Sequence, residues 1–278
     1  MSSGQLMDLQ LRRAIECRLT PERALLTLDD AQAFVSERGL LTRMPDSALP
    51  SLFGACHEEP ARAGGQGFAL WPKTKWIWSF QLVQRPGILL TKLHRGKSLY
   101  LSPEAAALID PIVRHEIAAA TGDEAILLDH LAEHGESTSQ DIGLELGWDR
   151  RRLKSARARL ERVGALVNDG LVFDDETTWH FAPLRRWDAA TEAAKAEGDP
   201  YAALLLAAVR AAVVTPESDI RGWFSWPIPA ETVDAMVRSG RLTRPAPGWI
   251  ASADSSVGGG AGISLRTSIH DECRLIVD

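Results

Sequence analysis

Seven basic side chains crowd into one short stretch between Asp149 and Gly164, and their chemistry points to a polyanion. Apolar residues recur there at three- and four-residue steps, which predicts an amphipathic helix with one buried stripe: Leu153, Ala156, Leu160 and Val163. The basic residues occupy the remaining faces: Arg150, Arg151, Arg152, Lys154, Arg157, Arg159 and Arg162. Such groups bind phosphate backbones, and arginine also pairs with guanine edges. The alternative is a solvated helix face with surface ion pairs.

The segments around this helix favour DNA contact. A helix is predicted from Asp123 to His134, ended by Gly135, and a second one begins at Thr138 and stops at Gly147. The basic helix comes third, and two strands with turns follow between residues 167 and 181. This order is typical of a winged helix, whose third helix reads DNA. We therefore expect DNA contacts from five of the seven basic residues: Arg150, Arg151, Arg152, Lys154 and Arg157.

A second basic cluster lies on a predicted hairpin. Four apolar or alternating runs indicate a small β-ribbon, with turns at Pro72, Pro86-Gly87 and Arg95-Gly96: 68–71, 76–83, 88–93 and 98–102. The last turn carries the basic group Lys92, His94, Arg95 and Lys97. A hairpin tip of this composition can enter a DNA groove, or it can be an ordinary solvated turn.

Composition bounds the remaining possibilities. The chain has 278 residues, 45% of them hydrophobic, which predicts two or three modules with ordinary cores. Its formal net charge is -6, so any DNA footprint must be local. Three scattered cysteines and seven histidines show neither a CxxC pair nor an HExxH spacing, so neither a metal site nor a cofactor is expected. No signal peptide and no membrane-spanning run is visible, which favours a cytoplasmic protein without a membrane partner.

The chain divides into four parts. We expect an N-terminal helical or winged-helix module with the β-ribbon at 1–120, a central winged helix at 121–188, a winged-helix-like module at 201–251 and a flexible tail at 252–278. In the third module, Thr215-Pro216 is predicted to begin the second helix, and 229–239 the third. The fold class is thus α+β, mainly α, with tandem winged helices and a small antiparallel β element.

Several short patterns resemble the winged-helix DNA glycosylase superfamily of the AlkZ/YcaQ type, and most closely its AlkZ-related branch. They span roughly residues 25 to 250 and comprise Thr27-Leu28-Asp29-Asp30-Ala31-Gln32-Ala33-Phe34-Val35 with Gly39, Leu49-Pro50-Ser51-Leu52-Phe53, Leu93-His94-Arg95-Gly96-Lys97, Leu101-Ser102-Pro103-Glu104, and Thr215-Pro216 with Ile220 and Trp226. The resemblance implies tandem winged helices around a β-rich element, in agreement with the segments inferred above.

The resemblance also implies a repair activity, because that family excises alkylated or crosslinked bases with a Gln-apolar-Gln or Gln-apolar-Asp signature. By chain order the signature should lie near Leu40 to Pro45, where this chain has no Gln. The pair Gln81 and Gln84 is spaced differently and, on one strand, would point to opposite faces. The catalytic residues therefore stay unknown, and base excision is predicted to be weak or absent unless Glu58, Gln81 or Gln84 replaces the signature.

Three functions compete at this point. The first is a repair-type DNA-binding protein that wraps double-stranded DNA as a monomer. The second is a winged-helix transcriptional regulator, which would usually dimerise on a palindromic site, although no dimer segment is visible. The third is a protein-interaction scaffold, favoured by the net negative charge and opposed by the Arg-rich helix. A continuous basic surface from that helix to the hairpin tip would favour the first function, and an isolated basic helix the second.

Overall fold

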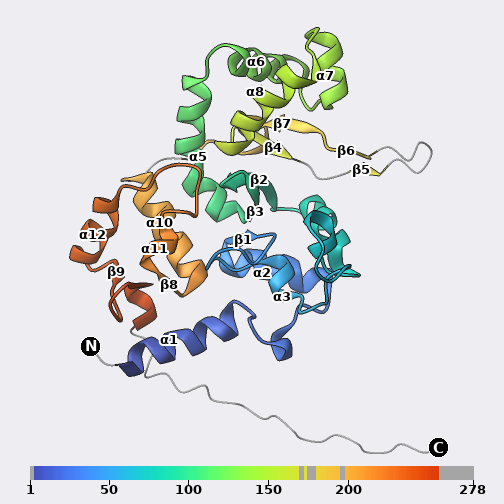
Figure 1. Cartoon of the computed structure of the whole chain (residues 1–278). Coiled ribbons are helices and arrows are strands. Elements are labelled where there is room, and N and C mark those ends of the chain that lie inside the picture. Colours follow the sequence, from blue (N-terminus) through green and yellow to red (C-terminus); the bar gives the residue numbers. More distant parts are fainter. Residues whose placement is uncertain (1–2, 169–171, 174–179, 195–197, 257–278) are drawn as a thin grey trace, which may run out of the picture.

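The computed structural model describes residues 3–168, 172–173, 180–194 and 198–256. It is mainly helical with small antiparallel sheets, which confirms the α+β, mainly α class. Three helix-and-sheet units follow one another along the chain, and the second stands apart above the other two (Figure 1). None of the helices in these ranges combines the length and the apolar character that a membrane span requires.

The first unit surrounds a three-stranded sheet. Its helices are α1 (Ser3–Glu16), α2 (Leu28–Arg38) and α3 (Leu52–Ala55), with a 3-10 turn η1 (Pro21–Arg23), and its strands are β1 (Leu40–Thr42), β2 (Leu89–His94) and β3 (Lys97–Leu101). Strand β3 pairs antiparallel with both others, so the sheet order is β1-β3-β2. A capping box fixes the start of α2, because Thr27 and Asp30 each accept a hydrogen bond from the other's backbone N–H.

The prediction of a four-stranded ribbon is wrong for two of its strands. The segment from 67 to 84 forms short helical turns instead: η2 (Gly67–Leu70), η3 (Lys75–Ile77), α4 (Trp78–Gln81) and η4 (Leu82–Gln84). The rings of Trp76 and Phe80, four residues apart, pack edge to face with centroids 6.1 Å apart, a contact that helical geometry makes possible. A short apolar run cannot be assigned to strand or helix by periodicity alone, and here helical packing of the aromatic rings prevails. The other two expected strands are β2 and β3.

The second unit contains the Arg-rich helix. The long helix α5 (Pro103–Ala119) leads into α6 (Asp123–His134), α7 (Ser139–Glu145) and α8 (Arg150–Arg162). Strands β4 (Leu166–Asn168), β5 (Val172–Phe173), β6 (His180–Phe181) and β7 (Leu184–Arg186) follow, before α9 (Trp187–Ala190). Strand β7 pairs with β4 and also bridges to Ser137, which lies between α6 and α7. The last paired strand is therefore the middle one, as in the first unit.

The third unit repeats this arrangement. It comprises α10 (Pro200–Ala212), β8 (Val214–Pro216), α11 (Glu217–Ile220), α12 (Ala230–Arg238), β9 (Leu242–Thr243), β10 (Trp249–Ser252) and η5 (Ala253–Ser256), with the sheet order β8-β10-β9. Thr215 and Pro216 lie in β8, which pairs with β10, so the helix predicted at this point begins one residue later, at Glu217, with Pro216 rather than Thr215 as its N-cap. Of the tail predicted to be flexible, residues 252–256 are part of β10 and η5, and 257–278 lie outside the described residues.

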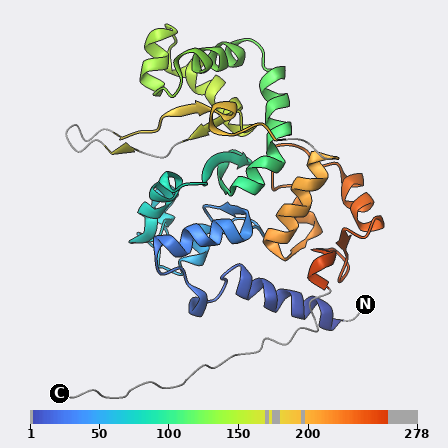
Figure 2. The same ribbon diagram turned by 180° about the vertical axis from the view of Figure 1, so that it is seen from behind.

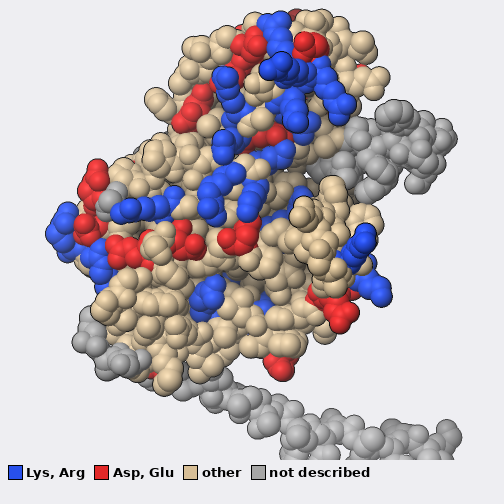
Figure 3. All heavy atoms as spheres, viewed as in Figure 1, with Lys and Arg blue, Asp and Glu red and all other residues tan. Residues whose placement is uncertain are grey.

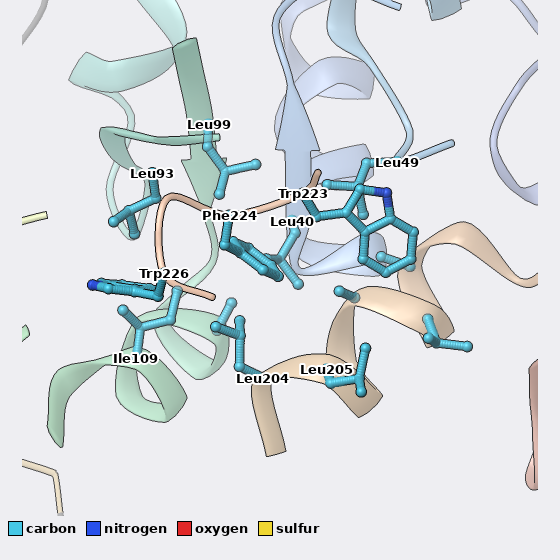
Figure 4. Close-up of a cluster of buried hydrophobic side chains, with 14 of the residues drawn as sticks. Leu40, Leu49, Leu93, Leu99, Ile109, Leu204, Leu205, Trp223, Phe224 and Trp226 are labelled. Atoms are coloured by element: carbon cyan, nitrogen blue, oxygen red, sulfur yellow. The ribbon is translucent and has the colours of Figure 1, made fainter. Parts of the chain in front are cut away.

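The largest apolar cluster joins the first and third units. Leu40, Leu93 and Leu99 of the first sheet meet Leu204 and Leu205 of α10 (Figure 4). Ile109 of α5 and the buried residues Trp223, Phe224 and Trp226 complete the contact. From behind, these two units form one body, and α5 leads from it to the second unit (Figure 2). The β2–β3 hairpin lies at this three-way junction.

Candidate nucleic-acid interface

Helix α8 begins and packs as its sequence predicts. The Asp149 carboxylate accepts a hydrogen bond of 2.7 Å from the backbone N–H of Arg152, which caps the first turn. Leu153, Ala156 and Leu160 are buried against α6 and the small sheet of the second unit. This packing fixes one face of the helix and directs most of its basic side chains outward.

Three of the seven basic side chains form ion pairs within their own unit. Arg152 makes two contacts with Asp123, of 2.6 and 3.0 Å, and its guanidinium lies 4.5 Å from the Trp148 ring centroid. Arg157 binds Glu161 at 2.9 Å and also donates to Ser139. Arg159 binds Glu124 at 2.6 Å. Of the predicted DNA contacts, Arg152 and Arg157 therefore already have carboxylate partners that would compete with phosphate.

The other four basic side chains of α8 are exposed. Within the described ranges no carboxylate forms an ion pair with any of them: Arg150, Arg151, Lys154 and Arg162. Three of these follow one stripe, because residues 151, 154 and 162 fall on the same side of a helix with 3.6 residues per turn. The exposed residues between them, Ser155 and Ala158, are small and leave room for a backbone to approach. Arg162 was not among the DNA contacts expected from the sequence.

The hairpin tip is the second expected contact. Arg95 and Gly96 both have positive φ, 54° and 81°, at the centre of a two-residue turn between the paired residues His94 and Lys97. A two-residue hairpin loop with positive φ at both positions is a type I′ turn. Arginine rarely adopts this conformation, whereas its glycine neighbour adopts it readily. The turn thus holds an exposed arginine at its tip against the backbone preference of that residue.

The expectation that His94 of the hairpin contacts DNA is wrong, because this side chain is buried. Its ring is fully buried and bonds through Nδ1 to the Trp223 carbonyl oxygen at 2.6 Å. Its Nε2 faces a carboxylate oxygen of Asp46 at 3.2 Å. Burial lowers the pKa of His94, despite the opposing effects of these two partners, and favours a neutral ring. His94 is therefore a junction residue and does not face a DNA backbone.

The two lysines of the hairpin also have protein partners. Lys92 pairs with Glu161, a buried residue of α8, and the more exposed Lys97 pairs with Asp46. Burial would raise the pKa of Asp46, but the hydrogen bond and the charge of Lys97 hold it below its usual value. The Leu93 carbonyl accepts a hydrogen bond of 2.9 Å from the backbone N–H of Ser225. The hairpin thus contacts all three units. Among the described residues, no carboxylate forms an ion pair with Arg95, unlike the two lysines of the hairpin.

The basic residues of α8 and the hairpin adjoin one another. Arg162 Nε lies 4.0 Å from the position that a Cβ on Gly96 would occupy, which places the end of α8 beside the tip of the turn. Figure 3 shows Lys and Arg side chains gathered over the second unit and continuing down to the middle of the molecule, with acidic side chains below them. We call Arg150, Arg151, Lys154, Arg162 and Arg95 the basic band.

No catalytic set replaces the missing glutamines at the expected place. Strand β1 is buried, and the guanidinium of Arg43 beyond it lies 4.9 Å from the Trp71 ring centroid. The Glu58 carboxylate accepts hydrogen bonds from Thr74 and from the backbone N–H of Lys75. Burial would raise the pKa of Glu58, but these bonds lower it, so the group is an ionised cap rather than a proton donor.

The two candidate glutamines, Gln81 and Gln84, are likewise not positioned for catalysis. Gln81 and Gln84 lie on consecutive helical turns, not on one strand, and both are exposed. Within the described ranges, neither side chain forms a hydrogen bond that would hold it in place. A general base or electrostatic stabiliser needs such positioning to act on a water molecule or a developing charge. The geometry therefore assigns no role in base excision to either residue.

The sequence reasoning also missed a cluster of metal-ligating side chains. His130, His134 and Glu145 place one ligand atom each within 4.8 Å of the others. Two histidines four residues apart on a helix face the same side, a signal that a search for the HExxH pattern overlooks.

Comparisons with protein-family models, with curated proteins and with solved structures find no match to this chain.

Proposed function

We propose that the protein binds double-stranded DNA through the basic band. The observation that carries this proposal is the set of four exposed basic side chains on α8 that have no ion pair with any described residue. A cationic group without a protein partner can bind a phosphate without first breaking an ion pair, whereas a group already paired with a carboxylate must give up that interaction. The net charge of -6 keeps the attraction local, so the molecule would meet DNA with this face.

Topology supports a winged-helix interpretation of all three units. Each unit runs helix, strand or bridge, helical segments and then further strands, two in the first and third units and four in the second, with the last strand paired in the middle. In the second unit this order makes α8 the third helix, which is the DNA-reading position of a winged helix, and makes β4–β7 the wing. The proposed fold agrees with the resemblance to winged-helix DNA glycosylases, and we extend the resemblance to DNA binding only.

Base excision is not part of the proposal. The paired glutamines are missing near β1, Glu58 is tied to a helical turn, and Gln81 and Gln84 are exposed. An assay for freed base on duplexes with methylated or crosslinked purines should detect no multiple turnover. Turnover that disappears in Glu58→Gln or Gln81→Ala would instead identify an excision residue.

The extent of the basic band favours a monomer that wraps DNA over a dimeric transcriptional regulator. The basic band reaches from α8 in the second unit to Arg95 in the first, so one chain offers a surface built from two units. A regulator that used α8 alone would need a second copy to match a palindromic site. Sedimentation of the complex should therefore give one chain per short duplex, and two chains per duplex would favour the regulator.

The binding experiment compares two triple variants by fluorescence anisotropy on one duplex. Arg151→Ala, Lys154→Ala and Arg162→Ala remove three members of the band. Arg23→Ala, Arg238→Ala and Arg241→Ala make the same change in net charge on exposed residues of the other two units. The band variant should lose at least about tenfold in affinity while the control changes little. Equal losses would show that net charge alone drives binding, and no loss in either would refute the proposal.

Plain, abasic and alkylated duplexes of one sequence should be used in parallel. A protein that follows the phosphate backbone binds all three through the same cations, so the band variant should weaken each by a similar factor. A loss confined to the damaged duplexes would place the lesion, rather than the backbone, against α8.

A further inference from the structure

Three side chains with metal-binding atoms meet where α6 packs against α7. His130 and His134 lie one helical turn apart near the end of α6, and Glu145 is the last residue of α7. One ring nitrogen of each histidine and one carboxylate oxygen lie within 4.8 Å of one another. Two imidazoles and a carboxylate form a donor set that suits zinc and its neighbours in the first transition row.

His130 supplies the observation that calls for a ligand. Its side chain is only 4% exposed, and its Nε2 has no hydrogen-bond partner in the structure. The nearest carboxylate oxygen, on Glu145, lies 3.2 Å away but is not aligned as an acceptor. Buried polar atoms in folded proteins nearly always have a partner, because leaving one unsatisfied costs desolvation energy. A cation between the two groups would satisfy both.

The hydrogen bond of His134 leaves one of its ring nitrogens free to bind a metal. Its Nδ1 lies 3.0 Å from the backbone carbonyl oxygen of His130, which places the ring proton on Nδ1 and leaves the lone pair on Nε2. Metal-bound histidines are commonly fixed in this way, by a carbonyl on the nitrogen that does not bind the metal. The two rings stack with centroids 4.4 Å apart, so both present an edge to the same side of α6.

We propose that His130, His134 and Glu145 bind one divalent transition-metal ion, with Zn²⁺ as the ion that fits the donors best. Ligand atoms of a tetrahedral zinc with ordinary bond lengths lie about 3.4 Å apart. The His130–Glu145 separation of 3.2 Å already matches this value. Only the exposed His134 side chain has to move closer, and its exposure leaves it free to do so. Water completes the coordination on the solvent side.

The ion would clamp α6 to the end of α7. Glu145 is followed by the turn that leads through Gly147 to the cap of α8 at Asp149. Holding Glu145 against α6 therefore restrains the helices that position α8. The site stands on observations separate from the basic band, so it holds or fails independently of DNA binding.

The test is calorimetric titration of the metal-free full chain with Zn²⁺. Glu145→Gln and His134→Ala remove exposed ligands and leave the buried His130 in place. Glu133→Gln is the matched control, because Glu133 is an exposed acid on the same helix and is not part of the cluster. A second control, His270→Ala with Cys273→Ser, removes potential ligands in the tail, which lies outside the described residues.

We expect one Zn²⁺ per chain in the parent and in both controls, with affinity at least tenfold weaker in Glu145→Gln and in His134→Ala. Because the ion binds only the folded chain, a hundredfold excess over Kd should raise the Tm of the parent by roughly 5 °C. The same excess should leave the Tm of the two ligand variants nearly unchanged. No saturable binding by the parent, or binding lost only in the tail control, would overturn the proposal.

Discussion

Helices α8 and α12 occupy the same place in two units of the same topology, yet they carry opposite charges. Their buried residues align, since Leu153 and Ala156 of α8 match Val233 and Met236 of α12 in spacing and in burial. In this register Arg151 corresponds to Glu231 and Lys154 to Asp234, and all four side chains are exposed. The two helices thus share the pattern of their buried residues but differ in the charge of their exposed residues.

The acids of α12 are partly engaged within their own unit. Asp234 and Glu217 both pair with Arg244 at 2.7 Å, and these bonds lower the pKa of each carboxyl. An acidic face of this kind repels a phosphate backbone. A shared topology therefore does not specify a DNA contact, because function depends on the exposed residues of each unit.

The largest expected effect comes from giving α8 the charges of α12. Arg151→Glu with Lys154→Asp replaces two phosphate-attracting groups by two repelling ones, and both sites are exposed, so the fold should persist. We expect a loss of more than about 100-fold in duplex affinity near 0.1 M salt. Glu231→Ala on α12 is the control and should bind as the parent does. Retained affinity in the swapped variant would move the interface away from α8.

A smaller effect is expected where α8 meets the hairpin. Glu161 is buried and pairs with both Arg157 and Lys92, so Glu161→Gln leaves two cations without their carboxylate. The free energy of unfolding, measured in urea, should fall by about 1–3 kcal/mol. Duplex affinity at a temperature where the variant stays folded should not fall. A loss of affinity without a loss of stability would show that Arg157 and Lys92 act in binding and not at the junction.

The buried His94 predicts a dependence of stability on pH. Because burial lowers its pKa below the usual 6.5, the unfolded chain takes up a proton before the folded chain does. The stabilising contribution is present above pH 6.5 and is lost as the pH falls below it. Asp46, Lys97, Arg95 and the Trp223 carbonyl are the groups around the ring that shape this response.

The check is the free energy of unfolding of the parent and of His94→Asn between pH 7.5 and 5. The amide of asparagine can replace the Nδ1–H donor but does not titrate. The curve of the variant should be flatter than that of the parent below pH 6.5. Parallel curves would mean that another group carries the acid sensitivity.

The smallest expected effect concerns the tip of the hairpin. Arg95→Asn keeps a polar residue, suits the positive φ of 54° better and removes one charge from the basic band. Stability should stay the same or rise by up to about 1 kcal/mol, since backbone strain is relieved. Duplex affinity should fall by a factor of roughly 2 to 5, as for one phosphate contact. Unchanged affinity would remove the hairpin from the interface and leave α8 alone.

The sequence was a good guide to the elements with strong local signals. The caps at Thr138 and Asp149 marked two helix starts, and the periodic apolar residues of α8 identified its buried stripe. Strands of only two or three residues, such as β1 and β8, carry no such signal, because pairing with a distant strand creates them. The aromatic run from 68 to 83 has no decisive local signal for a related reason, since its packing decides between strand and helix.

The interface was harder to predict than the fold. The sequence identifies seven basic residues on α8, but it does not show that three of them have carboxylate partners: Arg152, Arg157 and Arg159. The partners of Arg152 and Arg159 are 29 and 35 residues away along the chain, so only the packing of α6 on α8 reveals them. His94 is the same case, because its burial depends on Trp223, a residue of another unit.

The salt dependence of duplex binding tests the central claim most directly. The logarithm of the association constant falls linearly with the logarithm of salt concentration, with a slope near 0.9 for each neutralised phosphate. The variant with Arg151→Ala, Lys154→Ala and Arg162→Ala should have a slope smaller than that of the parent by about 2.7. The control triple variant at Arg23, Arg238 and Arg241 should run parallel to the parent. If the α8 variant also runs parallel to the parent, its three cations do not contact phosphate and the assignment of α8 as the DNA-binding helix is wrong.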